Sequence, residues 1–392
     1  MTSISSSSRR SRALGVGFAL LVAGLVAAVP AIDLARSAGF VARVAHRDTG
    51  ALGWLARASG GPFEVTELRV PSRHGVVRAR LYRPLRPVTR TVILTAGVHA
   101  LGIDEPRVMA LAREVARSGL AVVTPELPDL VKYRITPRLP DVIEDVALWA
   151  SHERGLAPDD RVALVGVSFS GGLSVIAAGR TSLRHRVAFT FSFGGHGDLG
   201  RTLRYLCTGS YPGARVPPPH DYGTAIILMN VADEVVPAAE ADGLRRAVSE
   251  FLMAAHYSMF DEARARLQLH QATAYAATLP EPSRTVARYV EARDVGRLGQ
   301  VLLPAVKRFP WSEALSPEHN PPPEGPVYLM HGAGDTVIPT AETEHLAAWL
   351  RERGVTVRTL VTPLITHADV DRGADSREAL RLAWFWSRML AD

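Results

Sequence analysis

The segment from Val162 to Gly179 constrains the fold of this chain more than any other. Residues Val162–Val167 are apolar or glycine and predict a short buried strand. Small residues follow around Ser168, and helical spacing begins near Gly171. A strand that turns directly into a helix through small residues holds the side chain at the turn in a strained backbone conformation. The hydroxyl of Ser168 would then stand at a helix N-terminus, where backbone N–H groups can meet a developing negative charge.

The same alternation of strand and helix surrounds this segment. A β-hairpin is predicted over 64–82, because both halves alternate polar and apolar residues around a turn at 72–75. Further strands are predicted at 91–95, 121–124, 187–191, 327–330 and 355–361, and helices at 105–118, 142–153, 341–353 and 376–390. Strands alternating with helices indicate an α/β fold with a mostly parallel central sheet flanked by helices.

Residues 197–324 interrupt this rhythm. They contain helical stretches separated by proline-rich loops, with one strand-like run at 225–229. We interpret them as a helical cap inserted into a core formed by residues 63–196 and 325–392. Residues 34–62 are predicted to be a helix and linker that precede the core.

The segment Gly166–Gly172 resembles the nucleophile elbow of the α/β-hydrolase superfamily, G-x-S-x-G followed by a second glycine. The last glycine of the motif is Ser170 here. This substitution opens a second register, in which Ser170 would be the nucleophile between Ser168 and Gly172. We favour Ser168 because that register keeps Gly166 at the end of the strand. The alternative to both registers is a glycine- and serine-rich turn without catalysis.

The resemblance implies that an acid and then a histidine follow the serine along the chain. Residues 327–339 resemble the acid-bearing strand end of the family, HG-x-x-D-x-x-x-P, and place the acid at Asp335. His367 follows the last predicted strand and takes the position of the base. Asp233, after the run at 225–229, is an alternative acid, although a helix-capping role suits it better. Asp198 is a second alternative, since some family members carry the acid on that strand.

Two backbone N–H groups are expected to bind the oxyanion, one from Phe169, which follows the nucleophile, and one from Val98. Val98 lies in the loop after an early parallel strand, where the family often has an HG pair and this chain has Ala96-Gly97. His99 then either lines the substrate pocket or caps the loop. His196 and Asp198 follow another strand end and are further candidates for the pocket.

The resemblance implies a serine hydrolase that cleaves a carboxylic ester of a small-molecule or lipid-like substrate through an acyl-enzyme. An acyltransferase, a peptidase of the same fold and a non-catalytic membrane-anchored binding protein remain alternatives. We expect no cofactor and no metal, because no His, Asp and Glu cluster has useful ligand spacing. The single cysteine, Cys207, excludes an intramolecular disulfide. A G-x-G-x-x-G match at 195–200 follows a late strand, where a dinucleotide site is not expected.

The N-terminus suggests a membrane anchor. Residues 1–12 are polar and carry three arginines, and residues 13–29 hold no charged side chain, a run of about 26 Å as a helix. We expect a single-pass anchor within residues 1–33 with the catalytic domain on the exoplasmic or periplasmic side. A cleaved signal, which would release a secreted protein, and the first helix of a soluble protein are the alternatives. The net charge of +6 comes from arginines scattered among acidic residues, so nucleic acid is not an expected partner.

Overall fold

The computed structural model of this chain describes residues 34–44, 50–364 and 376–391. They divide into two compact units, one drawn from Met1–Gly60 and Arg372–Asp392 and the other from Gly61–Asp371. The smaller unit contains a helix over residues 34–44, α2 (Gly50–Ala58) and α13 (Ser376–Ala391).

Side-chain contacts join the three helices of the smaller unit. The rings of Phe40 and Trp386 lie 4.7 Å apart, which connects the helix over 34–44 with α13. The guanidinium of Arg43 donates to the carbonyl oxygen of Ala56 at 2.8 Å, which connects that helix with α2. In the described part of residues 34–62, where a helix and linker are predicted, there are two short helices, and β1 begins at Phe63, with residues 59–62 between it and α2.

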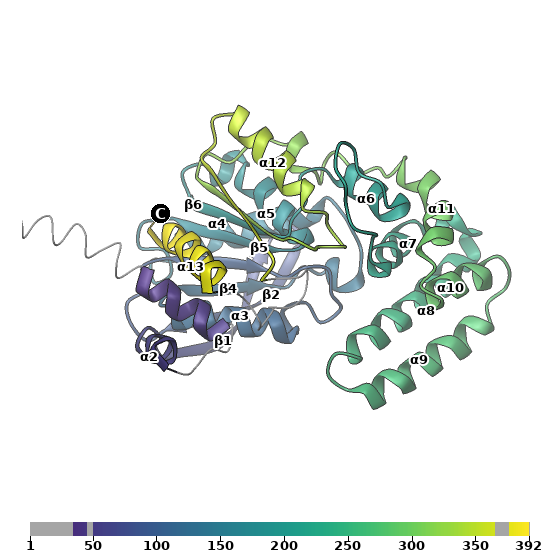
Figure 1. The fold of residues 1–392 in the computed structure, drawn as a ribbon, viewed down its shortest axis with the longest axis horizontal. Coiled ribbons are helices and arrows are strands. Elements are labelled where there is room, and N and C mark those ends of the chain that lie inside the picture. The colour runs from purple at the N-terminus through teal and green to yellow at the C-terminus, as the bar shows by residue number, and fades with distance from the viewer. Residues whose placement is uncertain (1–33, 45–49, 365–375, 392) are drawn as a thin grey trace, which may run out of the picture. The chain divides into compact units, whose positions relative to one another are not determined.

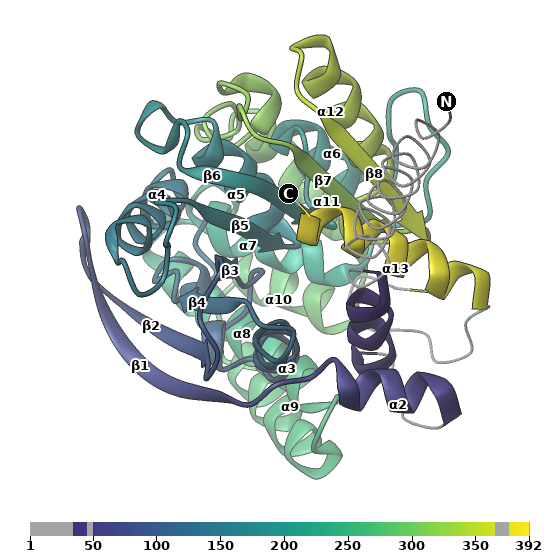
Figure 2. The ribbon, with the colours of Figure 1, turned by 90° about the vertical axis from the view of Figure 1, so that its left-hand side faces the viewer.

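The larger unit is built on one sheet, in which the described residues form eight strands in the order β1-β2-β4-β3-β5-β6-β7-β8. The strands are β1 (Phe63–Ser72), β2 (Gly75–Pro84), β3 (Thr91–Thr95), β4 (Ala121–Pro125), β5 (Val162–Val167), β6 (Val187–Phe193), β7 (Val327–Gly332) and β8 (Val357–Thr362). β1 and β2 form the predicted hairpin, and β2 also pairs antiparallel with β4. All other neighbours are parallel, so the prediction of an α/β fold with a mostly parallel sheet is confirmed. Figure 2 shows the twist of the sheet from β1 to β8.

In the described part of the larger unit, the helices with the most extensive contacts to the sheet are α3 (Pro106–Arg117), α4 (Arg138–His152), α5 (Phe169–Ala178) and α12 (Ala341–Glu352). α5 lies against β5 and β6, α4 against β1, β3 and β5, and α12 against β7 and β8. Every residue of β3 and β4 is buried, as expected for central parallel strands that are covered on both faces.

Six helices lie between β6 and β7: α6 (Leu199–Thr208), α7 (Asp221–Val235), α8 (Ala238–Tyr257), α9 (Glu262–Ala277), α10 (Ser283–Glu291) and α11 (Val295–Val306). We call these helices the cap. Figure 1 shows α6 and α7 beside the sheet and α8, α9 and α10 farther from it. α8 contacts α7, α9 and α10, and α11 returns to contact α6 and α7, so the last helix of the cap packs against the first two.

The prediction of a strand at 225–229 is wrong, because these residues lie inside α7. The helix is buried on most of its surface, from Gly223 to Leu228 and again at Val231 and Ala232. A short apolar run does not distinguish a buried helix from a buried strand. Asp233 therefore follows no strand, and it does not cap a helix N-terminus either. It lies in the last turn of α7, more than half exposed, and pairs with Arg245.

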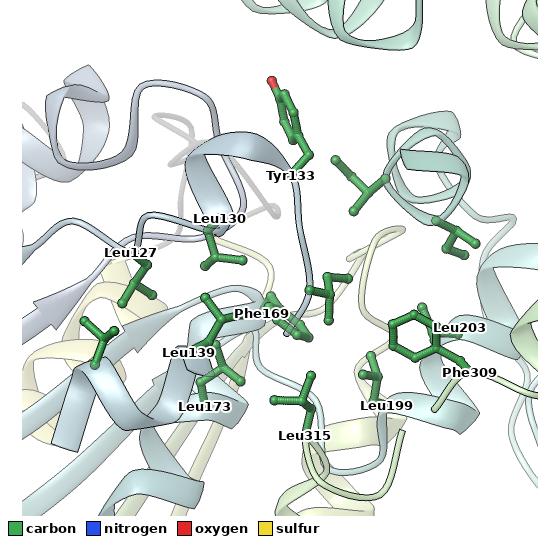
Figure 3. Close-up of a cluster of buried hydrophobic side chains, with 14 of the residues drawn as sticks. Leu127, Leu130, Tyr133, Leu139, Phe169, Leu173, Leu199, Leu203, Phe309 and Leu315 are labelled. Carbon is green, nitrogen blue, oxygen red and sulfur yellow. The ribbon is translucent and has the colours of Figure 1, made fainter. Parts of the chain in front are cut away.

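One continuous group of buried hydrophobic side chains joins the cap to the sheet. It runs from Ile93 and Leu164 of the sheet to Leu228 and Leu244 of the cap. Figure 3 shows its middle part, where Phe169 lies among leucines of the core and the cap; the labelled members are Leu127, Leu130, Tyr133, Leu139, Leu173, Leu199, Leu203, Phe309 and Leu315. The cap is therefore packed onto the core through a shared hydrophobic interior.

In the part of the chain that the structure describes, no helix has the length and apolar character needed to cross a bilayer. The apolar run at 13–29, on which the predicted anchor rests, lies outside the described residues.

Candidate active site

Ser168 stands between the last residue of β5 and the first residue of α5, with φ of +56° and ψ of −133°. This region of backbone space costs a non-glycine residue about 1–3 kcal/mol. The surrounding contacts maintain it: the N–H of Ser168 donates to the carbonyl oxygen of Phe193 at 2.6 Å. A Cβ at Gly166 would lie 2.1 Å from the carbonyl oxygen of Ser170, so only glycine fits there. The sharp turn predicted from the sequence is therefore present.

Ser170, the alternative nucleophile, is completely buried. Its hydroxyl donates a 2.5 Å hydrogen bond to the carbonyl oxygen of Ala96. The side chain therefore ties the first turn of α5 to the chain that leaves β3. This geometry favours the register in which Ser168 is the reactive serine.

The loop after β3, residues 96–101, passes directly beside Ser168. A Cβ at Gly97 would lie 3.0 Å from the Cβ of Ser168 and 3.6 Å from its Oγ, so a side chain at Gly97 would crowd the hydroxyl. Val98 follows at once. Phe169 is the first residue of α5, and the N–H of a residue in this position has no partner within the helix. Both predicted oxyanion donors thus belong to segments that border Ser168.

Asp335 lies in the loop after β7 and is 2% exposed. Its Oδ1 accepts hydrogen bonds from the N–H groups of Val337 at 2.8 Å and Ile338 at 3.0 Å. Its Oδ2 lies 3.3 Å from Nε2 of His331. The imidazole of His331 is fully buried, with Nε2 2.8 Å from the carbonyl oxygen of Ile338. Since that oxygen only accepts, Nε2 carries a proton. His331 therefore holds the loop that carries Asp335 in shape.

His367, the predicted base, lies outside the described residues. The strand that leads toward it is described. β8 pairs in parallel with β7 up to Gly332 and Thr362, and the N–H of Ala333 donates to the carbonyl oxygen of Thr362 at 2.9 Å. The chain therefore leaves β8 next to the loop that carries Asp335.

The strand order, the antiparallel β2 and the strained serine between β5 and α5 together decide the fold type. The chain has an α/β-hydrolase fold. No protein-family model matches the sequence, and no curated protein matches it either.

Several solved structures resemble this α/β-hydrolase fold at low sequence identity. An esterase from Pyrobaculum calidifontis is 17% identical, with 90% of this chain and 94% of that chain covered and a TM-score of 0.45. Brefeldin A esterase, described as a bacterial homologue of human hormone-sensitive lipase, is 15% identical over 93% of this chain and 82% of its own, with a TM-score of 0.44. Carboxyl esterase 2 from Tuber melanosporum is 13% identical over 83% and 86%, with a TM-score of 0.43.

His196 and Asp198, the other candidates for the pocket of this hydrolase fold, are engaged in packing and capping. The ring of His196 is fully buried and stacks on Phe169 with centroids 4.9 Å apart, and its Nε2 lies 2.8 Å from the carbonyl oxygen of Leu315. Burial lowers the pKa of this imidazole. Asp198 caps α6 by accepting from the N–H of Arg201, and its Oδ2 lies 3.0 Å from His319.

The sequence reasoning missed two cap residues that contact the loop 96–101. The hydroxyl of Tyr222, on α7, donates to the carbonyl oxygen of Val98 at 2.6 Å. Nδ1 of His256, on α8, lies 3.0 Å from Nε2 of His99. These partners are 124 and 157 positions apart along the chain, and neither residue belongs to a motif. His99, which was expected either to line the pocket or to cap the loop, accepts from the N–H of Leu101 at 3.1 Å and so caps the loop.

The loop of Asp335 also contacts the cap. The carbonyl oxygen of Thr336, the next residue, accepts from the N–H of His220 at 2.8 Å and from the hydroxyl of Tyr205 at 3.2 Å. Burial, followed by the charge of Asp335, raises the pKa of Tyr205, so this phenol remains a neutral donor at ordinary pH. The cap thus contacts two loops that border the candidate site.

Proposed function

We propose that this chain is a serine hydrolase that cleaves carboxylic esters through an acyl-enzyme. Ser168 is the nucleophile, His367 the general base and Asp335 the acid that orients it. The observation that carries the proposal is the strained backbone of Ser168, with φ of +56°, at a strand-to-helix turn beside Gly97. Strain of this kind is retained where a side chain must be presented to a reacting group.

In the proposed reaction, Oγ of Ser168 attacks the ester carbonyl carbon while Nε2 of His367 takes the hydroxyl proton. Asp335 fixes the tautomer of the imidazole and stabilises its charged form. The negative charge on the carbonyl oxygen is met by the N–H groups of Phe169 and Val98. Collapse of the intermediate expels the alcohol, which receives the proton from His367. Water then cleaves the acyl-enzyme by the same steps and regenerates the serine.

The two N–H donors that hold Asp335 support its role as the acid, because they fix the orientation of its carboxyl group in the loop after β7. The pairing of β8 with β7 supports His367 as the base, because it brings the chain that leads to His367 beside the Asp335 loop. The buried hydrogen bond of Ser170 supports the assignment of Ser168 over its neighbour.

Covalent labelling with a fluorophosphonate tests the proposal, using the full chain in detergent. We expect wild type and Ser170→Ala to be labelled and to hydrolyse p-nitrophenyl esters, and Ser168→Ala to do neither. Labelling lost only in Ser170→Ala would move the nucleophile by two residues. A folded wild type that is not labelled and cleaves no ester would contradict the proposal and favour a binding protein.

Product analysis with the same protein separates the related reactions. Transfer of the acyl group to added alcohols in preference to water would identify an acyltransferase, and faster cleavage of aminoacyl amides than of esters would identify a peptidase. Esters with acyl chains of increasing length test whether the substrate is lipophilic. A rate that rises with chain length would support a lipid-like substrate.

We further propose that the apolar run at 13–29 anchors the chain in a membrane, with the hydrolase domain on the exoplasmic or periplasmic side. Membrane fractionation with carbonate extraction tests the anchor, and digestion of intact cells or spheroplasts by an added protease tests the side. Release of the full-length chain by carbonate would contradict the anchor. A mature chain that begins near residue 29 would instead indicate a cleaved signal.

A further inference from the structure

Two cap helices hold the loop that carries the second oxyanion donor. Tyr222 lies in the first turn of α7, and its hydroxyl donates to the carbonyl oxygen of Val98 at 2.6 Å. Burial of this hydroxyl raises the pKa of Tyr222, so the group remains a donor across the physiological range. The hydrogen bond fixes the peptide unit that follows Val98.

His256, in the last turn of α8, holds the next residue of the loop. The N–H of Leu101 donates to Nδ1 of His99, so Nδ1 of His99 is an acceptor and its proton is on Nε2. Nε2 then donates to Nδ1 of His256 at 3.0 Å. Burial, followed by the neighbouring His256, lowers the pKa of His99 to about 4, and burial lowers the pKa of His256. Both rings are therefore neutral near pH 7, as this hydrogen bond requires.

The charged side chains around the loop are compatible with a neutral, hydrogen-bonded pair of His99 and His256. The charged side chains that face the histidine pair are Glu105 and Arg107, which lie beside both rings, and Arg264, which lies near His256. Glu105 and Arg107 bind each other at 2.6 Å. The phenol of Tyr133 is largely buried, and burial raises its pKa to about 12. The loop is thus held by hydrogen bonds from the cap at two successive residues, Val98 and His99.

We propose that Tyr222 and His256 are positioning residues, which orient the loop 96–101 so that the N–H of Val98 points to the oxyanion. The second half of the oxyanion hole then depends on the cap being seated on the core. The physical reason is that the cap holds the loop at the carbonyl oxygen of Val98 and at the ring of His99, on one side of the Val98 N–H, while the bond from Ser170 to Ala96 holds it on the other side. Anchors on both sides limit the φ and ψ rotations that would turn this N–H away from the oxyanion. The inference rests on the proposed function, since an oxyanion arises only if Ser168 attacks a carbonyl.

The first test compares Tyr222→Phe with Tyr289→Phe, which removes a hydroxyl elsewhere in the cap, on α10. We expect kcat for p-nitrophenyl esters to fall about 10–100-fold in Tyr222→Phe with KM changed less than about threefold, because a full oxyanion donor contributes about 10²–10³. Tyr289→Phe should match wild type. A trifluoromethyl ketone forms a tetrahedral adduct with an oxyanion, and its affinity should fall by the same factor as kcat. The affinity of the matching methyl ketone should not change.

The second test exchanges His256 and does not depend on the folding of Tyr222→Phe. His256→Asn retains an acceptor near the position of Nδ1, whereas His256→Leu removes it. We expect His256→Leu to show the same selective loss of kcat and of trifluoromethyl ketone affinity, and His256→Asn to recover most of it. A merely structural contact would change unfolding temperature without this selectivity.

Three results would overturn the inference. One is an unchanged kcat and unchanged trifluoromethyl ketone affinity in both Tyr222→Phe and His256→Leu. Another is equal weakening of both ketones, which would indicate a role in binding the ground state. The third is a wild type that a fluorophosphonate does not label, which would remove the proposed function together with this inference. The first two results, obtained with a labelled wild type, leave the proposed function standing.

Discussion

The hydroxyl of Ser170 and the carbonyl oxygen of Ala96 are joined by a buried hydrogen bond of 2.5 Å. It links the first turn of α5 to the start of the loop 96–101, immediately beside Ser168. The two serines of the elbow thus have different surroundings. Ser168 lies in a strained turn, whereas the hydroxyl of Ser170 makes a hydrogen bond in the protein interior. This difference leads to the first prediction.

Ser170→Ala should lower the free energy of unfolding by about 1–3 kcal/mol, because it leaves the buried carbonyl of Ala96 without this donor. Ser168→Ala should cost less stability, since a side chain held in a strained turn for its reactivity is expected to contribute little to the stability of the fold. Chemical denaturation of the two variants measures both values. A larger destabilisation by Ser168→Ala would contradict this division of roles.

Gly97→Ala should reduce kcat/KM by at least about 10²-fold, because the added Cβ would lie 3.0 Å from the Cβ of Ser168 and displace the loop that carries Val98. Gly296→Ala, in the exposed first turn of α11, is the matched control and should keep full activity. Steady-state kinetics on one ester substrate checks the pair. Wild-type kinetics in Gly97→Ala would show that this loop takes no part in the reaction.

Asp335→Asn should lower kcat by about 10⁴-fold without loss of the fold, as expected when the acid of a Ser–His–Asp triad no longer fixes the imidazole. Asp198→Asn should keep activity and the cap of helix α6, because asparagine caps a helix as well as aspartate does, and it should lose only the charge that faces His319. Kinetics and thermal unfolding of the two variants are the measurements. If activity instead depends on Asp198, the acid is on the other strand end.

Acid pH should destabilise the protein through His99, whose pKa burial lowers from the ordinary 6.5 to about 4. Between these values the unfolded chain binds a proton that the folded chain does not, so the free energy of unfolding falls as the pH drops from 6.5 to 4. The full contribution is on the order of 3 kcal/mol, and it is present above pH 6.5. His99→Gln, which keeps a donor toward His256, should show a shallower dependence. Equal pH dependence in urea unfolding of both proteins would rule out this assignment.

Glu342 should be among the costliest carboxylates to remove. It is fully buried, accepts from the N–H groups of Gly197 and Asp198 at 2.8 and 2.9 Å, and pairs with Arg201 at 2.7 Å. Glu342→Ala would leave the Arg201 charge without one of its partners and should cost about 3–5 kcal/mol. Glu344→Ala, on the exposed face of the same helix, should change stability by less than about 0.5 kcal/mol. Denaturant unfolding of the two variants provides the comparison.

The sequence predicted the central parallel strands and the turn at Ser168 because both depend on local features. Val162–Val167 is uniformly apolar, and a strand followed at once by small residues and a helix has few other backbone solutions. The run at 225–229 has the same apolar composition, yet it is a helix. Burial of this run on most sides by the cap and the core decides that it forms a helix and not a strand. A short apolar run carries no information about these tertiary surroundings.

The sequence by itself determined the turn at Ser168, the strand end that precedes Asp335 and the alternation of strands and helices in the core, since each is encoded in residues within a few positions of one another. Only the tertiary structure decided that Ser170 binds Ala96, that His99 caps its loop, and that Tyr222 and His256 hold that loop from the cap. The contacts of Ser170, Tyr222 and His256 join residues that are 74 to 157 positions apart along the chain, whereas the cap of His99 is local. Hydrogen bonds of this kind depend on how the cap packs against the sheet, and no local spacing or motif records that packing.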